Sequence, residues 1–496
     1  MPREGSVAAS DRSIGAPIRS SEEYLASLRG RRLTVYLSGK RVEEPVDHPV
    51  IRPSINAVAA TYDAAPEDLD LATAESGLTG ERVNRFLHLA GSPADLVAQS
   101  QMQRRLGQLT GTCFQRCVGM DAINALFSLT FDVDAARGTP YHTRFVAWLA
   151  AVQRQNLVVG GAMTDVKGDR SQSPGQQADP DLFVRVAERR PDGVVLRGAK
   201  AHQTGAVNSH WLLVMPGLRL QPEEHDYAVA CAVPVAAPGL TFVLGRQSSD
   251  SRSLEGDLDV GNARFAGQEA LVVFDDVFVP HERVFLDGET EFAADLVERF
   301  TAYHRRSYVC KAGVGDVLIG AAALIADYHG VPEASHVRDK LVEMGHLNET
   351  IYATGIAASH QGHPTAAGNW EPDHLLANVC KQHVTRFPYE IARLAQDLAG
   401  GAVVTLPSEQ DLHHPEVGPL LDKYLRGRAD VPTEHRFRVL RLIENLTLGR
   451  NAVGYLTESL HGAGSPQAQR VVIRRQLDLE ARKALARRLA GIPPEG

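Results

Sequence analysis

The sequence predicts an α+β chain with a helical N-terminal part, a central β-rich part and a C-terminal helical bundle. Apolar residues repeat with a helical period from residue 20 to about 158, alternate in short runs from about 159 to 290, and return to a helical period after about 291. Hydrophobic residues make up 44% of the 496 positions, which is enough for a large folded core. The first 19 residues are polar, and we expect a disordered extension there.

The N-terminal part, residues 20–158, contains a series of amphipathic helical patterns. A serine that can cap a helix opens the first pattern, and three longer patterns follow it. The patterns are SEEYLASLRGRR, ADLVAQSQMQRRLGQL, CFQRCVGMDAINALFSLTFDVD and HTRFVAWLAAVQRQN. We therefore expect a helical domain over this range.

The central part, residues 159–290, shows the alternation typical of strands. DLFVRVAERRPDGVVLRGAKAHQTG alternates apolar and polar residues around a Pro-Asp-Gly turn, which predicts a hairpin. HWLLVMPG, YAVACAVPV, LTFVLGR and ALVVFDDVFVP are further short runs bounded by Gly and Pro. These runs predict an antiparallel sandwich or barrel.

The C-terminal part, residues 291–496, again reads as long helices with short connections, which predicts an antiparallel bundle. The stretch that contains YHRRSYVCKAGVGD is compatible with a helix along nearly its whole length. In the last pattern, RRQLDLEARKALARRLAG, basic residues alternate with acidic ones, which is typical of a helix that faces solvent or another subunit.

Composition excludes several classes of protein. A net charge of -8 argues against a nucleic-acid partner. The sequence contains no run of 18 apolar residues, so we expect no membrane span. Its polar start does not resemble a secretory signal. Five cysteines without a paired framework are typical of a reducing cytoplasm, where clustered cysteines more often bind metal or take part in chemistry.

Four residues could form a metal site. Cys113 and Cys117 are four apart, so in a helix their thiols would share one face. His304 and Cys310 lie in a second helix-compatible stretch, and three thiolates with one imidazole suit zinc or an iron–sulfur cluster. The alternative for each pair is ordinary core packing. Cys231 and Cys380 lie among apolar residues, and we interpret both as structural.

Polar residues gather at three further places. The loop GAMTDVKGDRSQSPGQQADPD offers backbone N–H groups and an arginine to an anionic ligand, or is simply a solvated loop. RGAKAHQTGAVNSHW places dense polar groups in a strand pattern, which favours a ligand or buried partners. Glu458 and His461 could transfer protons or cap a helix end, and Glu269 precedes an apolar strand where burial would raise its pKa.

Several of these motifs together resemble the 4-hydroxybutyryl-CoA dehydratase family, flavin and iron–sulfur relatives of the 4-hydroxyphenylacetate 3-monooxygenases. The motifs are CFQRCVGMDA, MTDVKGDRS, VLRGAKAHQTGAVNSH, GQEALVVFDDVFVP, YHRRSY and TESLHGAGSPQAQR. The resemblance covers about residues 20–491. It implies an acyl-CoA dehydrogenase-like fold, a homotetramer, an acyl-CoA substrate, and FAD bound between domains and between subunits together with a [4Fe–4S] cluster.

The resemblance also implies roles for particular residues. The cluster would be held by Cys113, Cys117, His304 and Cys310. FAD would contact Met163, Thr164, Asp165, Lys167, Asp169, Arg170, His202, Gln203 and Thr204. Glu269, Glu458, Tyr308 and Lys311 would lie near substrate and flavin, and His304 could leave the cluster to act as a base.

The implied reaction is the dehydration of 4-hydroxybutyryl-CoA to crotonyl-CoA, with vinylacetyl-CoA isomerisation as a related activity. FAD would take up one electron temporarily, so that the C3 proton becomes acidic, and an iron would help the hydroxyl to leave. The alternatives are a two-component flavin-dependent phenol monooxygenase and a cluster-free homologue that binds an acyl-CoA.

The chain departs from the family pattern at SYVCKAG, which is one residue shorter than Ser-Tyr-Gly-Gly-Cys-Lys. Losing one residue inside a helix would rotate the residues that follow by about 100°. Losing it at a non-helical turn could be absorbed without that rotation. The position of Cys310 therefore depends on whether the helix is broken here.

Overall fold

The computed structural model describes residues 16–245, 258 and 264–493. Residues 1–15 of the expected extension lie outside this range, and residues 16–19 have no regular structure. The N-terminal part supplies helices α1 (Ser21–Leu28), α2 (Arg52–Glu67), α3 (Leu69–Ala72), α4 (Pro93–Thr110), α5 (Cys117–Arg137) and α6 (Tyr141–Gln155). It also supplies strands β1 (Thr34–Leu37), β2 (Lys40–Val42), β3 (Thr73–Glu75) and β4 (Arg82–Asn84), which the helical reading did not predict.

Two sheets make up the central part. Its strands are β5 (Val159–Ala162), β6 (Arg185–Arg190), β7 (Gly193–Thr204), β8 (Trp211–Val214), β9 (Val229–Pro234), β10 (Leu240–Leu244), β11 (Glu269–Pro280) and β12 (Val284–Asp287). One sheet has the order β2-β1-β10-β11-β7-β6, and the other β12-β9-β8-β5. The predicted hairpin is confirmed, because β6 and β7 pair antiparallel from Arg190 opposite Gly193.

The pairing is antiparallel except at two places, β1 with β10 and β5 with β8. Both exceptions join strands that are far apart in the sequence. Apolar residues from both sheets pack into one core, as expected for a sandwich (for example Val194, Val272, Val214 and Cys231).

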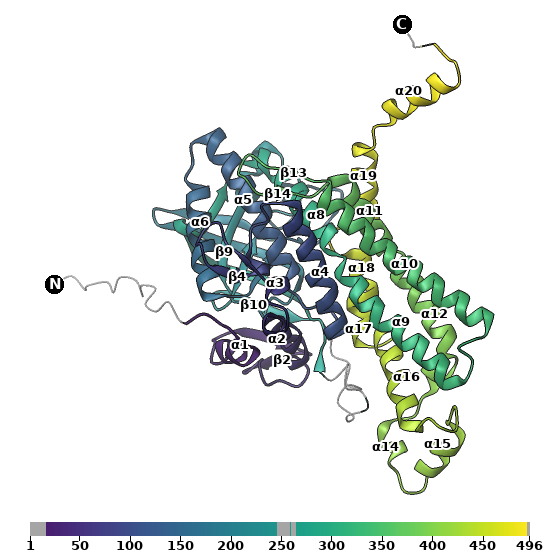
Figure 1. The fold of residues 1–496 in the computed structure, drawn as a ribbon. Coiled ribbons are helices and arrows are strands. Elements are labelled where there is room, and N and C mark those ends of the chain that lie inside the picture. The colour runs from purple at the N-terminus through teal and green to yellow at the C-terminus, as the bar shows by residue number, and fades with distance from the viewer. Residues whose placement is uncertain (1–15, 246–257, 259–263, 494–496) are drawn as a thin grey trace, which may run out of the picture.

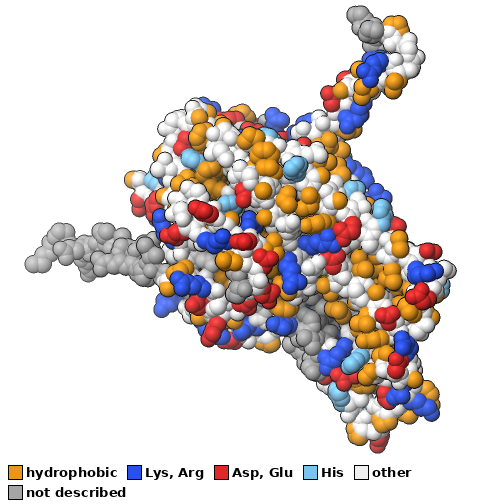
Figure 2. All heavy atoms as spheres, in the orientation of Figure 1, with side chains coloured by type: hydrophobic (Ala, Val, Ile, Leu, Met, Phe, Trp, Pro, Cys, Tyr) orange, Lys and Arg blue, Asp and Glu red, His pale blue; other side chains and the backbone are white. Residues whose placement is uncertain are grey.

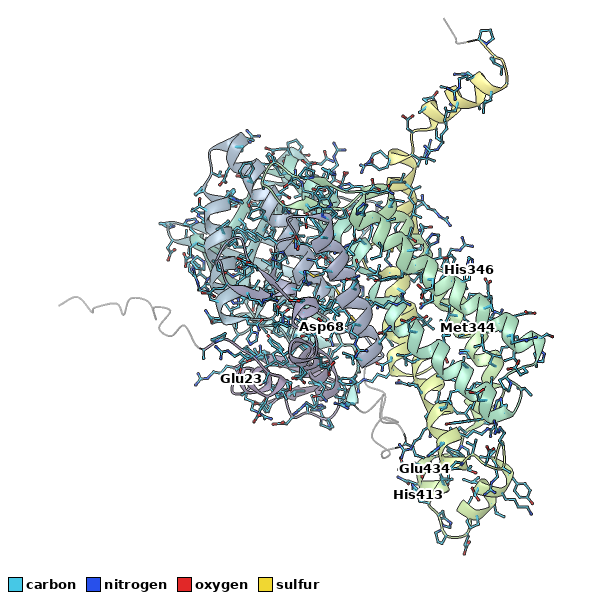
Figure 3. The ribbon with its side chains drawn as sticks, viewed as in Figure 1. Glu23, Asp68, Met344, His346, His413 and Glu434 are labelled. Atoms are coloured by element: carbon cyan, nitrogen blue, oxygen red, sulfur yellow. The ribbon has the colours of Figure 1, made fainter. Side chains whose placement is uncertain are left out.

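The C-terminal part is a helical bundle with a projecting lobe and arm (Figure 1). Helices α9 (Cys310–His329), α10 (Ser335–His360), α12 (Phe387–Ala399) and α16 (Thr433–Thr447) pack against one another. Met344 on α10 is fully buried in the bundle core, whereas His346 on the same helix is exposed (Figure 3). This alternation along one helix is the amphipathic pattern that predicted the bundle.

The remaining C-terminal elements lie around the bundle, except the last helix, which projects away from it (Figure 1). They are α8 (Ala293–Ser307), β13 (His363–Pro364), β14 (Trp370–Glu371), α11 (His374–Val384), α13 (Ala402–Thr405), α14 (Glu409–Leu412), α15 (Gly418–Tyr424), α17 (Arg450–Ala452), the π-helical turn η8 (Val453–Thr457), α18 (Glu458–His461), α19 (Pro466–Gln476) and α20 (Leu479–Leu489). Cys231 on β9 and Cys380 on α11 are fully buried, in keeping with structural roles.

The stretch Thr290–His329 is long and apolar enough to cross a membrane by length and composition alone. It consists mainly of α8 and α9, and 67% of its most apolar window is buried inside the chain. That burial is typical of core helices in a folded protein.

Candidate active site

Cys113 and Cys117 lie on either side of the start of α5. Gly111, with a left-handed φ of 60°, ends α4, and Gln115 has a φ of 62°. Cys117 is the first residue of α5, so Cys113 belongs to the non-helical segment between the two helices. The prediction that both cysteines share one helical face is wrong, because these two left-handed residues interrupt the helical pattern.

Cys310 also begins a helix. Helix α8 ends at Ser307, α9 starts at Cys310, and Tyr308 and Val309 form a turn between them. The expected continuous helix is therefore broken. The one-residue shortening of SYVCK falls at this break, where it does not rotate a continuous helix.

The three cysteine side chains converge from these segments. The side chains of Cys117 and Cys310 are close enough to interact, and Cys117 lowers the pKa of the Cys310 thiol, while burial and Cys310 raise the pKa of the Cys117 thiol. Gln103 Nε2 donates to Cys117 Sγ over 3.2 Å. Burial and the Glu458 carboxylate, whose Oε1 lies 3.7 Å from Cys113 Sγ, raise the pKa of the Cys113 thiol.

His304 is held by a buried carboxylate. Its Nδ1 lies 2.8 Å from Asp121 Oδ2, and Ser307 Oγ donates to Asp121 Oδ1 over 2.8 Å. Only 1% of the Asp121 side chain is exposed. Because Nδ1 is engaged with Asp121, Nε2 is the nitrogen left for a further ligand.

This donor set fits an iron–sulfur cluster. Three thiols with one imidazole are ligands that iron–sulfur clusters take, and Cys117 and Cys310 lie among apolar residues such as Phe114 and Met120. Within the described residues, no group of three or more His, Cys, Asp or Glu side chains is arranged to hold a metal ion. A four-iron cluster separates its protein ligands more widely than one ion does, because each ligand binds a different iron.

The buried Lys311 and the half-buried Glu458 form an ion pair beside Cys113. Lys311 Nζ donates to Glu458 Oε2 over 3.2 Å and to the Gly454 carbonyl over 2.8 Å. Burial alone would lower the pKa of Lys311, but the Glu458 carboxylate and the neighbouring thiols raise it above its usual value. Gly454 belongs to η8, and π-helical turns of this kind are frequent at functional sites.

Glu269 and Tyr308 complete the polar surroundings. Thr204 Oγ1 lies 2.8 and 2.9 Å from the carboxyl oxygens of Glu269, and burial together with Glu458 raises the pKa of Glu269 well above 4.5. Burial and Glu458 also raise the pKa of Tyr308. Lys381 Nζ lies 4.0 Å over the Tyr308 ring.

The two segments predicted to contact FAD lie side by side. Ala201 N donates to the Thr164 carbonyl over 3.0 Å, as does Gln203 Nε2. The backbone of His202 has a φ of 58°. Partial desolvation of its imidazole lowers its pKa, and the nearby Lys167 cation lowers that pKa further. The 163–170 loop and residues 202–204 of β7 form a polar surface where they meet.

Other members of the predicted flavin set have partners within the chain. Met163 packs in the core, and Asp165 binds Lys200 Nζ over 2.5 Å and the Gly217 N–H over 3.1 Å. These two side chains therefore anchor the loop. The carboxylate of Asp169 accepts hydrogen bonds from Ser171. Thr164, Lys167, Asp169 and Arg170 are exposed, and their contact with FAD stays a prediction.

Comparison with known families accounts for nearly the whole chain. Residues 20–286 match the family model described as 4-hydroxyphenylacetate 3-hydroxylase N terminal, and residues 293–491 match the model of its C terminal part. The chain belongs to the 4-hydroxyphenylacetate 3-hydroxylase family. Its sequence identity to individual members of that family differs widely.

Within the family, the similarity to dehydratases is much higher than the similarity to oxygenases. A Clostridium aminobutyricum protein named 4-hydroxybutyryl-CoA dehydratase/vinylacetyl-CoA-Delta-isomerase is 55% identical over 96% of this chain and 100% of its own length. An oxygen-tolerant archaeal 4-hydroxybutyryl-CoA dehydratase from N. maritimus is 63% identical, with a TM-score of 0.95 and 96% of each chain covered. The FAD complex of a 4-hydroxyphenylacetate 3-monooxygenase oxygenase component is 24% identical, with a TM-score of 0.84 over 95% of this chain and 98% of that one, and shows the shared fold.

Sequence reasoning missed three residues at this site. Asp121 follows Cys117 by four positions on α5, so helical spacing could have indicated it. Gln103 and Lys381 lie far from the cysteine motifs in sequence, on α4 and α11. No local pattern could have linked either residue to the site.

Proposed function

We propose that this chain is a 4-hydroxybutyryl-CoA dehydratase, a hydro-lyase that forms crotonyl-CoA and also isomerises vinylacetyl-CoA. The observation that carries the proposal is the convergence of Cys113, Cys117 and Cys310 beside the Glu458–Lys311 pair. The named dehydratases, at 55% and 63% identity, support it. When bound, FAD would supply one-electron transfer and a [4Fe–4S] cluster a Lewis-acidic iron.

The cofactors would be held by the residue sets described above. Cys113, Cys117, His304 and Cys310 would ligate the cluster, and the 163–170 loop with residues 202–204 would contact FAD. The named FAD complex of a relative with the same fold supports the flavin assignment. Thiolate ligands of this kind also suit a reducing cytoplasm.

The reaction sets a definite demand for proton transfer. Dehydration removes one proton from C2 and one from C3, returns one proton to C4, and releases the other with the hydroxyl as water. Isomerisation of vinylacetyl-CoA needs only the C2 and C4 steps. The site therefore requires side chains that accept protons and at least one that donates.

The residues near the thiols can meet that demand. Lys311 orients the Glu458 carboxylate as one proton acceptor, and His304 is the second. Burial raises the pKa of Glu269 well above 4.5 and so favours the protonated carboxyl group, which suits Glu269 to donate a proton. Tyr308 keeps its phenol proton for the same reason and can hydrogen-bond to the thioester.

An acyl-CoA assay tests this function. We expect anaerobically prepared protein to convert 4-hydroxybutyryl-CoA to crotonyl-CoA, identified by chromatography and mass spectrometry. Glu458→Gln should lower kcat by about 10²- to 10⁴-fold, because it removes a positioned proton acceptor. The matched control is Glu390→Gln, at an exposed ion pair with Arg393, and it should leave kcat unchanged. Loaded protein that forms no crotonyl-CoA but hydroxylates a phenol would contradict the proposal.

A further inference from the structure

Asp121 connects the cysteine segment to the histidine. It lies one helical turn after Cys117 on α5, while His304 and Ser307 lie at the end of α8. One carboxyl oxygen contacts His304 Nδ1 at 2.8 Å, and the other accepts from Ser307 Oγ at 2.8 Å. Both carboxylate oxygens of Asp121 therefore have a hydrogen-bonding partner inside a buried site.

A simpler explanation would make Asp121 the counter-ion of the buried Arg306. Arg306 does lie within ion-pair distance, with Nη2 3.6 Å from Asp121 Oδ1, but this contact is longer than those of Asp121 with His304 and Ser307. Arg306 instead donates to the Leu96 carbonyl at 3.0 Å and to Gln99 Oε1 at 3.0 Å. The shorter contacts of Asp121 therefore go to His304 and Ser307.

We propose that Asp121 is a positioning residue that fixes the tautomer of His304. A carboxylate only accepts hydrogen bonds, so the His304 nitrogen that faces it must carry the proton. With the proton on Nδ1, the lone pair is on Nε2 and is available to an iron or, after release, to a substrate proton. The inference rests on the proposed function in so far as His304 serves as ligand and base.

The tautomer of His304 can be measured in the full chain prepared without metal. We expect ¹⁵N-histidine NMR of the metal-free full chain to show His304 protonated on Nδ1, with its signals assigned by their loss in His304→Gln. A proton on Nε2 in the wild-type chain would overturn the proposal. This readout does not depend on cluster or turnover, so it stands even if the proposed function fails.

Two variants test the consequence for the metal site. Asp121→Asn places an N–H donor beside Nδ1 and should move the proton to Nε2, weakening iron binding about 10- to 100-fold on anaerobic reconstitution. Asp121→Asn should also abolish the ¹⁴N hyperfine coupling that a cluster ligated by His304 would show. Ser307→Ala, the control, removes the other hydrogen bond to the same carboxylate and should leave tautomer and coupling unchanged.

The outcomes separate positioning from mere stability. An Asp121→Asn protein with the wild-type tautomer and unchanged iron affinity would refute the proposal. If Asp121→Asn does not fold, the wild-type tautomer decides the question alone. A wild-type chain that takes up no cluster, yet protonates His304 on Nδ1, would contradict the proposed function and retain the role of Asp121.

Discussion

Glu269 is a residue whose pKa the fold raises well above its usual value. It opens β11, accepts from Thr204, and lies close enough to Glu458 for that charge to raise its pKa, after the larger effect of burial. Between its usual pKa of 4.5 and the raised value, the folded state binds more protons than the unfolded state. This group therefore lowers the free energy of unfolding as the pH rises through that window.

Replacing Glu269 should expose that dependence. We expect Glu269→Gln, which mimics the protonated acid, to match the wild-type Tm near pH 4.5 and to exceed it increasingly towards pH 8. Glu390→Gln should show the opposite sign, because Arg393 lowers the pKa of Glu390 and the variant loses that pairing as the pH rises. Thermal unfolding across pH measures both, and a Glu269→Gln difference that does not grow with pH would contradict the account.

At the scale of elements, the site depends on how closely α4 and α9 cross. A Cβ at Gly107 on α4 would come within 2.6 Å of the Cys310 carbonyl, and one at Gly313 on α9 within 2.1 Å of the Arg104 carbonyl. These two glycines let the helices meet beside Cys310. On the same helix, a Cβ at Gly320 would meet nothing within 4 Å.

This contrast supplies a matched pair of variants. Gly313→Ala should force the helices apart, lowering Tm and iron content together. Gly320→Ala should raise stability by up to about 1 kcal/mol, because alanine favours helix over glycine at an open position. Thermal unfolding and iron analysis compare them, and equal stability and iron content in the two variants would argue against close helix packing as a condition of the site.

The limits of sequence reasoning are clearest at this scale. Periodicity predicted α4, α5, α8 and α9, but not the breaks at Gly111 and Tyr308 that orient the cysteines. The break after α4 depends on the left-handed Gly111, whereas Tyr308 and Val309 keep right-handed backbone angles, and neither feature leaves much trace in an apolar pattern. The parallel pairing of β1 with β10 could not be predicted from a local pattern either, because it joins segments about 200 residues apart.

The residues of the candidate site could be named from the sequence, but the contacts between them could not. The cysteines, His304 and Glu458 were singled out by residue type and spacing and Lys311 by the family resemblance, whereas the contacts among Cys113, Lys311 and Glu458 came only from the fold. Thr204 and Glu269, named separately, turn out to be hydrogen-bonded neighbours across β7 and β11. Local spacing indicates residue types, whereas the distances between segments require tertiary structure.

At the scale of the whole molecule, the C-terminal arm, helix α20, is exposed to solvent along its length. None of the residues of α20 is buried, and Leu485 and Leu489 are 53% and 84% exposed. The arm leaves the body beyond α19 (Figure 1), and it stands clear of the surface in the space-filling view (Figure 2). An isolated helix this short is only marginally stable in water, so the predicted homotetramer leads us to expect that α20 packs on another subunit.

Removing the arm tests this assembly. We expect a chain that ends at residue 477 to keep its fold but to form a smaller oligomer than the full chain, measured by light scattering. Asp478→Ala, which removes the N-cap of α20, should weaken assembly less. An unchanged mass for the shortened chain would exclude the arm as an assembly element.

The content of iron, sulfide and flavin in anaerobically purified protein tests the central claim most directly. The account predicts about four irons and four sulfides per chain together with FAD, and loss of iron in Cys113→Ala, Cys117→Ala and Cys310→Ala but not in Cys231→Ala. Flavin without iron, combined with oxygen-dependent hydroxylation of a phenol, would contradict it.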